Sequence, residues 1–248
     1  SYPSSIAVDA AGNVYVADTY NYTIRRLAPA GTNWVVSTLA GLAGVQGSAD
    51  GSNSLARFTY PQGLAVDSAT NVYVTDGSAI RRLTPLGTNW AVTTLAGVVG
   101  TSGSTDGTNR AALFYFPFGI AVDSARNLYV ADQGNHTIRK VAPLGANWVV
   151  STLAGLAGGS GSSDGANSAA RFYFPGGVAL DGAGNLYVAD SGNHTIRKLA
   201  PAGSDWLTST LAGAPGLGGS ADGTNGVARF NFPLGIATDS AGYHLYVA

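Results

Sequence analysis

The sequence contains no cysteine, no methionine and no glutamate, and lysine occurs only at Lys140 and Lys198. The absence of cysteine excludes disulfides, thiolate zinc sites and cysteine nucleophiles. All 14 acidic residues are aspartate. Glutamate and lysine favour helices, whereas the valine, threonine and tyrosine found throughout this chain favour strands. The composition therefore predicts an all-β protein.

Charge is also scarce. Charged residues make up 11% of the 248 residues, and the formal net charge is −1. Such a chain has no electrostatic footprint for nucleic acid or an anionic membrane. No apolar run reaches the roughly 18 residues of a spanning helix, so no membrane insertion is expected. A lysine-poor surface rich in small polar residues suits an exported protein. We expect a secreted or cell-surface location, with any export signal removed or outside the chain.

Five corresponding segments begin with a proline, at spacings of 58, 56, 58 and 58 residues: Pro3, Pro61, Pro117, Pro175 and Pro233. An apolar strand ending in Asp follows each proline, and a second strand then carries a tyrosine, as at Tyr15. Tight turns lead to a third strand, such as 195–199, and to a fourth that starts at a tryptophan. Four short strands joined by tight turns form an antiparallel meander.

Four strands per repeat, repeated around a ring, is the plan of a β-propeller. The nearly continuous apolar strands require cover on both faces, which only neighbouring repeats supply. We predict one propeller domain over residues 1–248, with four complete blades at about 3–60, 61–116, 117–174 and 175–232. Residues 233–248 form half of a fifth blade. The parent protein is expected to have five or six blades, or the open ends to meet another copy.

The turn before the third strand resembles the motif that names the NHL repeat. Asn193, His194 and Ile196 occupy its signature places, and Asn135 and His136 repeat the match one copy earlier. The first copy has tyrosine in the histidine place, and the second is two residues shorter and lacks the Asn-His pair. The repeats are longer than usual, as in bacterial-type NHL propellers. The resemblance implies a propeller, usually of six blades.

The extra length lies in a linker before each proline. Every complete copy carries an Asp-Gly pair there, interpreted as a turn, followed by a stretch such as 169–172 that predicts one helical turn. Because the linker recurs, we expect each one to fold over the junction between blades in the same way.

The recurring polar residues are interpreted as structural. Aspartates after the first and second strands, such as Asp9 and Asp18, are expected to accept backbone N–H bonds at turns. His136 and His194 are equivalents in adjacent blades and too far apart to share a zinc ion. Three Asn-x-Thr triplets match the glycosylation pattern, but they fall on the NHL-like turn. We therefore predict no metal site, no catalytic residue and no cofactor.

Aromatic clusters of the form aromatic-x-aromatic precede each later proline. Their outer positions are expected in the core, whereas the middle position and the residue after the proline vary between copies. Both variable positions lie where the linker enters the innermost strand, at the rim of the central channel. Exposed aromatic rings there suit stacking on sugar or peptide. The predicted ligand-binding residues are Tyr60, Gln62, Tyr115, Phe118, Tyr173 and Asn231.

The favoured function is a non-catalytic binding or scaffold propeller that holds a protein or glycan ligand on the linker face. A second hypothesis is a metal-dependent enzyme that resembles propeller lactonases or lyases, whose metal sites commonly include a glutamate that this chain lacks. A third is a structural subunit that self-associates through open blade edges.

Overall fold

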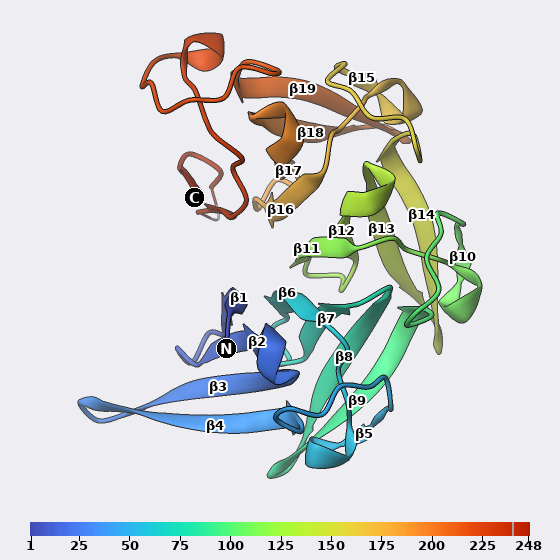
Figure 1. Ribbon diagram of the computed structural model, residues 1–248, viewed down its shortest axis with the longest axis vertical. Helices are drawn as coiled ribbons and strands as arrows, with labels where there is room; N and C mark the ends of the chain where they lie inside the picture. Colours follow the sequence, from blue (N-terminus) through green and yellow to red (C-terminus); the bar gives the residue numbers. More distant parts are fainter. Residues whose placement is uncertain (240) are drawn as a thin grey trace.

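The computed structural model describes residues 1–239 and 241–248 as an arc of radial blades (Figure 1). Each blade is a separate antiparallel sheet, and consecutive strands pair from the inside outwards. Four blades are complete, and two strands begin a fifth. The predicted β-propeller is therefore confirmed. The arc is open on one side, with β1 (Pro3–Val8) and β20 (Ile236–Thr238) flanking the opening.

The four inner-to-outer strands recur with nearly constant lengths. Blade 1 adds β2 (Val14–Asp18), β3 (Thr23–Ala30) and β4 (Asn33–Gly41) to β1. Blade 2 contains β6 (Pro61–Val66), β7 (Val72–Asp76), β8 (Ala79–Leu86) and β9 (Asn89–Gly97). Blade 3 contains β11 (Pro117–Val122), β12 (Leu128–Asp132), β13 (Thr137–Leu144) and β14 (Asn147–Gly155). Blade 4 contains β16 (Pro175–Leu180), β17 (Leu186–Asp190), β18 (Thr195–Ala202) and β19 (Asp205–Gly213), and the half-blade contains β20 and β21 (Leu245–Val247).

Each of the first three linkers adds a fifth strand to the next blade. These two-residue strands are β5 (Gly51–Ser52), β10 (Gly107–Thr108) and β15 (Gly165–Ala166), and they pair with the outer strands β9, β14 and β19. A single 3₁₀ turn follows each one, at Asn53–Leu55, Asn109–Ala111 and Asn167–Ala169. The helical turn is thus slightly earlier than predicted, and the prediction that Asp-Gly forms a turn is wrong. The glycine starts a strand, and the aspartate binds a buried arginine.

The core lies between blades. Tyr15 of blade 1 packs edge-on against Trp90 of blade 2, with ring centroids 6.1 Å apart. The same contact joins Tyr73 to Trp148 at the next junction. Around each contact gather buried aliphatic residues from both blades. This packing covers both faces of an inner blade and explains the continuous apolar strands.

Backbones approach most closely along the inner strands. A Cβ atom on Gly119 would lie 2.5 Å from the carbonyl oxygen of Gly176 and 2.8 Å from Cα of Gly177. Only glycine permits that approach, so the glycine two residues after the proline sets the spacing of blades at the channel.

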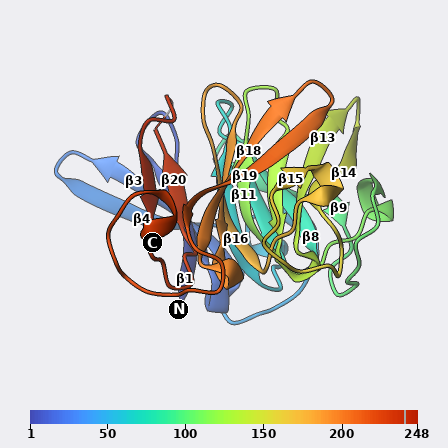
Figure 2. The ribbon, with the colours of Figure 1, turned by 90° about the horizontal axis from the view of Figure 1, so that it is seen from above.

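In the edge view, β1 and β20 lie on the opposite side from β8, β9, β13 and β14 (Figure 2). No helix among the described residues is long and apolar enough to cross a membrane.

Candidate ligand-binding face

The rim of the propeller is held by a buried charge network at the end of the second strand in blades 2 to 4. In blade 3, the Asp132 carboxylate accepts hydrogen bonds from Arg139 Nη1 at 2.7 Å, Asn135 Nδ2 at 2.7 Å and the backbone N–H of Tyr115 at 2.8 Å. The side chains of Asp132 and Arg139 are fully buried. Burial raises the pKa of Asp132 to about 6, although the guanidinium of Arg139 and the Asn135 amide oppose this rise.

Arg139 also fastens the preceding linker to the blade. Its Nη2 donates to Asp106 Oδ1 at 2.7 Å and to the Thr105 carbonyl at 3.1 Å, and the guanidinium lies 5.1 Å from the ring centre of Phe114. Arg81 and Arg197 make the same contacts in blades 2 and 4. Sequence reasoning missed this network, although the presence of the aspartates and the arginine in each of these blades was a visible signal.

The aspartates after the first strand of each blade bind the turn as predicted. Asp9 accepts hydrogen bonds from the backbone N–H groups of Ala11 and Asn13, from the Asn13 amide and from the Tyr15 hydroxyl. Asp67 and Asp181 have equivalent partners. These turns lie at the opposite end of the strands from the linkers. The aspartates after the second strand also accept backbone N–H bonds as predicted, here from the linker. Their ion pair with arginine was not predicted.

Both NHL-turn histidines are structural, as predicted. His136 and His194 adopt the left-handed conformation, with φ of 60° and 59°. The Nδ1 atom of His136 accepts the backbone N–H of Phe174 at 3.2 Å, and that of His194 accepts the N–H of Phe232 at 3.0 Å. A neutral imidazole that accepts at Nδ1 carries its hydrogen on Nε2. Burial also lowers the pKa of His136, which favours this neutral form.

Two of the three Asn-x-Thr asparagines are not accessible as glycosylation acceptors. The Asn135 and Asn193 side chains are buried, and the Nδ2 atom of Asn193 donates to Asp190 and to the carbonyl of Gly161. In the described parts of the chain, no three His or Asp side chains gather in an arrangement that could hold a metal ion.

The aromatic clusters divide their rings between core and surface. The first ring is fully buried at Phe58, Phe114 and Phe172, as predicted. The prediction of a buried third ring is wrong: Phe116 is 51% exposed and Phe174 is 43% exposed. Both residues have φ near +50°, and this left-handed turn directs the chain into the inner strand while the ring stays at the surface.

The structure places the predicted site residues at the rim, but in separate groups. Tyr173 is exposed and lies beside Phe174 and His136, with ring centroids 4.9 and 5.7 Å away. Tyr115 contacts Phe116 in the same manner one blade earlier. Sequence reasoning missed Phe116, Phe174 and His136 as members of these clusters, because it assigned them to the core or to a turn.

A third group is built by blades 1 and 2. The hydroxyl of Tyr60 donates to that of Tyr20 at 2.9 Å, and the Tyr20 ring lies edge-on to both Tyr60 and Tyr2. Gln62 is half-buried beside this group, and its backbone carbonyl accepts a hydrogen bond from the Ser4 hydroxyl. Asn231 is exposed in the last linker.

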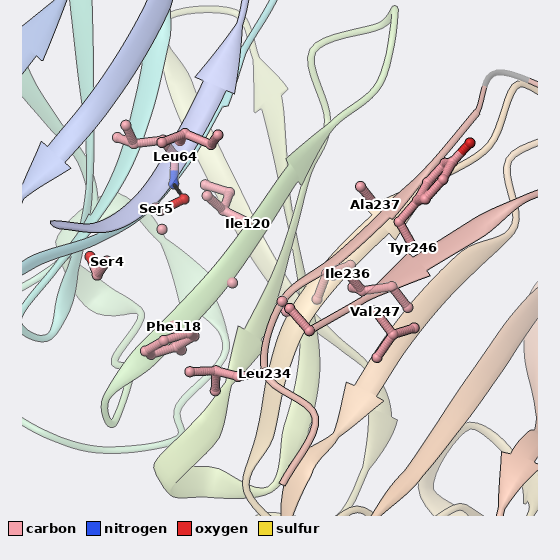
Figure 3. A pocket seen from close by; sticks show the side chains of 17 residues that line it. Ser4, Ser5, Leu64, Phe118, Ile120, Leu234, Ile236, Ala237, Tyr246 and Val247 are labelled. Atoms are coloured by element: carbon pink, nitrogen blue, oxygen red, sulfur yellow. Dashed lines mark hydrogen bonds between the residues drawn. The ribbon is translucent and has the colours of Figure 1, made fainter. Parts of the chain in front are cut away.

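The remaining predicted residue, Phe118, lines a cavity of about 460 Å³ in the central channel. Figure 3 shows Phe118 and Leu234 side by side at one end and the strand residues Leu64 and Ile120 further in. The lining is mostly apolar, with Ser4, Ser5 and Tyr246 as its hydroxyl-bearing residues. The Ser5 hydroxyl accepts the Leu64 N–H at 3.2 Å. The channel therefore offers an apolar recess bordered by the aromatic rim.

Comparisons with known proteins agree with this architecture. The model of the NHL repeat family matches residues 1–27, 114–141 and 172–199. NHL repeat-containing protein 2 of Bos taurus is 39% identical over 99 residues, which is 39% of this chain and 13% of that protein. The chain thus spans only a small part of the curated relative's length.

Solved structures show the same fold at low sequence identity. An auxiliary nutrient binding protein from Bacteroides ovatus matches with a TM-score of 0.69 and 20% identity, over 96% of this chain and 54% of that one. A virginiamycin B lyase from Staphylococcus aureus matches with a TM-score of 0.60 and 13% identity, over 99% of this chain and 62% of that one.

Proposed function

This chain belongs to the NHL-repeat β-propellers, and from that premise we propose that it is a non-catalytic binding module. The ligand, a glycan or a protein segment, lies on the face that carries the linkers and the NHL turns. The observation that carries the proposal is the set of exposed rings at this rim, chiefly Tyr115, Phe116, Tyr173 and Phe174. Monomeric proteins rarely expose such clusters without a binding role.

The rim is uncharged. Segments 114–118, 133–136 and 172–176 contain no Lys, Arg, Asp or Glu, and burial lowers the pKa of His136, which favours its neutral form. The charged groups beneath them, Asp132 and Arg139, pair with each other out of solvent. Flat aromatic surfaces with amide and hydroxyl groups but no net charge suit a neutral ligand, which stacks on the rings.

The rim is also rigid enough to bind without a large ordering cost. The backbone N–H groups of Tyr115 and Tyr173 donate to the buried Asp132 and Asp190, and that of Phe174 donates to the half-buried His136. Preorganised binding groups lose less entropy when a ligand arrives. We further propose that the chain acts as one propeller domain and that it is exported, on the basis of its lysine-poor composition.

Screening the protein against arrays of neutral glycans and of peptides tests the proposal. We expect binding to one class, lost in Tyr173→Ala and retained in Tyr243→Ala. Tyr243 is a suitable control because it is 86% exposed and lies in the turn after β20, at the strand end opposite the linkers. Binding that survives Tyr173→Ala, Tyr115→Ala and their combination would rule out this face.

The lyase of similar fold motivates one further check on the enzyme alternative. That alternative requires a tightly held metal ion, whereas a binding module requires none. Metal analysis of the purified protein, together with assays for lactone and ester turnover, distinguishes the two. One stoichiometric ion together with ordinary turnover would contradict the non-catalytic proposal.

A further inference from the structure

Three blades present a pair of neighbouring exposed rings on the face that carries the linkers. The ring centroids are 5.2 Å apart in blade 1, 5.8 Å apart in blade 3 and 4.9 Å apart in blade 4. The pairs are Tyr2–Tyr20, Tyr115–Phe116 and Tyr173–Phe174. One tyrosine of each pair is exposed to almost the same degree: Tyr20 to 46%, Tyr115 to 44% and Tyr173 to 40%.

This tyrosine comes from different segments in different blades. In blade 3 it lies in the linker, and its ring rests on Gly134 of the NHL turn, where a Cβ atom would lie 2.6 Å from Tyr115 Cδ1. Blade 1 has the reverse arrangement, with Tyr20 in the place of Gly134 and the small Ser1 in the place of Tyr115. The Tyr20 N–H donates to the Ser1 carbonyl, just as the Gly134 N–H donates to the Tyr115 carbonyl. The Tyr20 side chain therefore begins at the point where the Tyr115 ring lies in blade 3.

The exchange of the tyrosine between linker and turn separates a surface role from a role in folding. Blade 4 repeats the arrangement of blade 3, since a Cβ on Gly192 would lie 2.4 Å from Tyr173 Cδ1. Blade 2 folds without a tyrosine at either place, with Thr59 in the linker and Gly77 in the turn. An exposed ring that recurs although its source changes favours contact with a ligand over packing of the core.

The ring pairs of blades 3 and 4 form one continuous track through His136. This histidine follows Gly134, on which the Tyr115 ring rests, by two residues, and two residues span at most about 7 Å. The His136 imidazole in turn lies 5.7 Å from the Tyr173 ring and 4.8 Å from the Phe174 ring. The two pairs are therefore close enough to bind neighbouring units of one chain molecule. These four rings and His136 are called the ring track below.

The backbone of the ring track favours a sugar over a peptide strand as the ligand. The N–H groups of Tyr115 and Tyr173 donate to the aspartates at the ends of the second strands. The N–H groups of Gly134 and Gly192 donate to the carbonyls of these two tyrosines. An added peptide strand is held by main-chain hydrogen bonds, and these groups are already paired. The apolar C–H face of a pyranose requires only the faces of aromatic rings.

We propose that the ring track binds a linear, neutral polysaccharide, with the Tyr115–Phe116 and Tyr173–Phe174 pairs as successive subsites for one chain. The track is part of the face described above, so this assignment rests on the proposed function and specifies its ligand. One sugar unit stacks on each ring, and a disaccharide fills one pair. A longer chain occupies both pairs, and its second contact is strengthened because it forms within an existing complex.

The test uses the full chain with four soluble neutral polysaccharides, namely mixed-linkage β-glucan, galactomannan, arabinoxylan and amylose. A proline-rich peptide represents the protein ligands that bind aromatic grooves without adding a strand. We expect calorimetry to detect binding of one polysaccharide. Its hexasaccharide should bind at least about 100-fold more tightly than its disaccharide, as expected for two linked contacts. Equal affinities of the two oligosaccharides would overturn the assignment of successive subsites.

Variants of one pair test whether the two subsites act together. Tyr115→Ala should weaken hexasaccharide binding by at least about tenfold and disaccharide binding by less than about threefold, because the blade 4 pair remains. Tyr243→Ala should leave both affinities unchanged. Tyr115→Ala weakening both oligosaccharides equally would show that the blade 3 pair is not a separate subsite, and would overturn the proposal.

A double variant tests the exchange of rings directly. Tyr115→Ser combined with Gly134→Tyr gives blade 3 the arrangement of blade 1, and we expect it to restore most of the hexasaccharide affinity that Tyr115→Ala loses. Tyr173→Ser with Gly192→Tyr repeats the test in blade 4, so that misfolding of one double variant does not decide the result. Failure of a folded double variant to restore binding would overturn the equivalence of the rings.

Failure of this assignment is distinguishable from failure of the proposed function. Binding of the proline-rich peptide but of no polysaccharide, lost in Tyr173→Ala, would overturn the polysaccharide assignment and support the binding face. Binding of none of these probes would overturn both. Binding that is unaffected by Tyr115→Ala and Tyr173→Ala would also overturn both.

Discussion

Arg139 Nη1 lies 2.7 Å from Asp132 Oδ2, and neither side chain has any exposed surface. In blade 1 the equivalent residues, Arg25 and Asp18, are 3.6 Å apart, and the arginine is partly exposed. Removing one member of a buried ion pair leaves an uncompensated charge, whereas an exposed pair contributes little. The chain thus contains a buried and an exposed version of one interaction.

Replacing the buried arginine is expected to be far more destabilising than replacing the exposed one. Arg139→Met leaves the Asp132 and Asp106 carboxylates without their cation and should reduce the free energy of unfolding by about 3–5 kcal/mol. Arg25→Met should cost no more than about 1 kcal/mol. Urea unfolding of both variants measures the difference. Equal costs would show that burial of the pair is not what stabilises the rim.

The close approach of the inner strands predicts a strong response to one methyl group. Gly119→Ala places a Cβ 2.5 Å from the Gly176 carbonyl oxygen, so the inner strands must separate. We expect a loss of more than about 2 kcal/mol in the free energy of unfolding. In Gly226→Ala the nearest atom is 3.9 Å away, and no loss is expected. A Gly119→Ala protein as stable as Gly226→Ala would contradict the role given to this glycine.

Acid sensitivity follows from the turn aspartates. Burial alone raises the pKa of Asp181, but hydrogen bonds from Asn185, Tyr187 and the backbone outweigh it and place the pKa below the ordinary 3.8. The unfolded chain therefore binds this proton more readily, so the stability that Asp181 contributes is present above about pH 4 and is lost as pH falls through the folded pKa.

A single variant isolates this contribution. Asn185→Ala removes the amide donor and should cost about 1.5–3 kcal/mol near neutral pH, since the hydrogen bond is to a charged group. The difference from the parent protein should shrink as pH falls below about 4, because the parent then loses the same interaction. Urea unfolding at several pH values measures it, and a difference that stays constant with pH would argue against an ionised Asp181.

Much of the fold could be predicted because it repeats. The spacing of the prolines and the Tyr and Trp positions gave the blades, and the Asn-His turn indicated the family. The fifth strand of blades 2 to 4 could not be predicted, since two residues such as Gly51 and Ser52 carry no alternation of apolar and polar side chains. Its pairing with β9 joins residues about 40 positions apart.

The candidate site was only partly visible in the sequence. Tyr115 and Tyr173 were found because the middle ring of the cluster varies between repeats. Phe116 and Phe174 were assigned to the core, because a conserved ring in every repeat normally packs inside, and nothing in the sequence shows the left-handed turn that exposes them. The partnership of Arg139 with Asp106 was hidden by the 33 residues that separate them.

The most direct test of the account is a footprint of the bound ligand. Hydrogen exchange is compared with and without the glycan or peptide that gives the strongest array signal. We expect protection at 114–118, 133–136 and 172–176, where the exposed rings and the NHL turn meet. Protection confined to the opposite turns, at 67–71, 123–127 and 181–185, would contradict the assignment of the binding face.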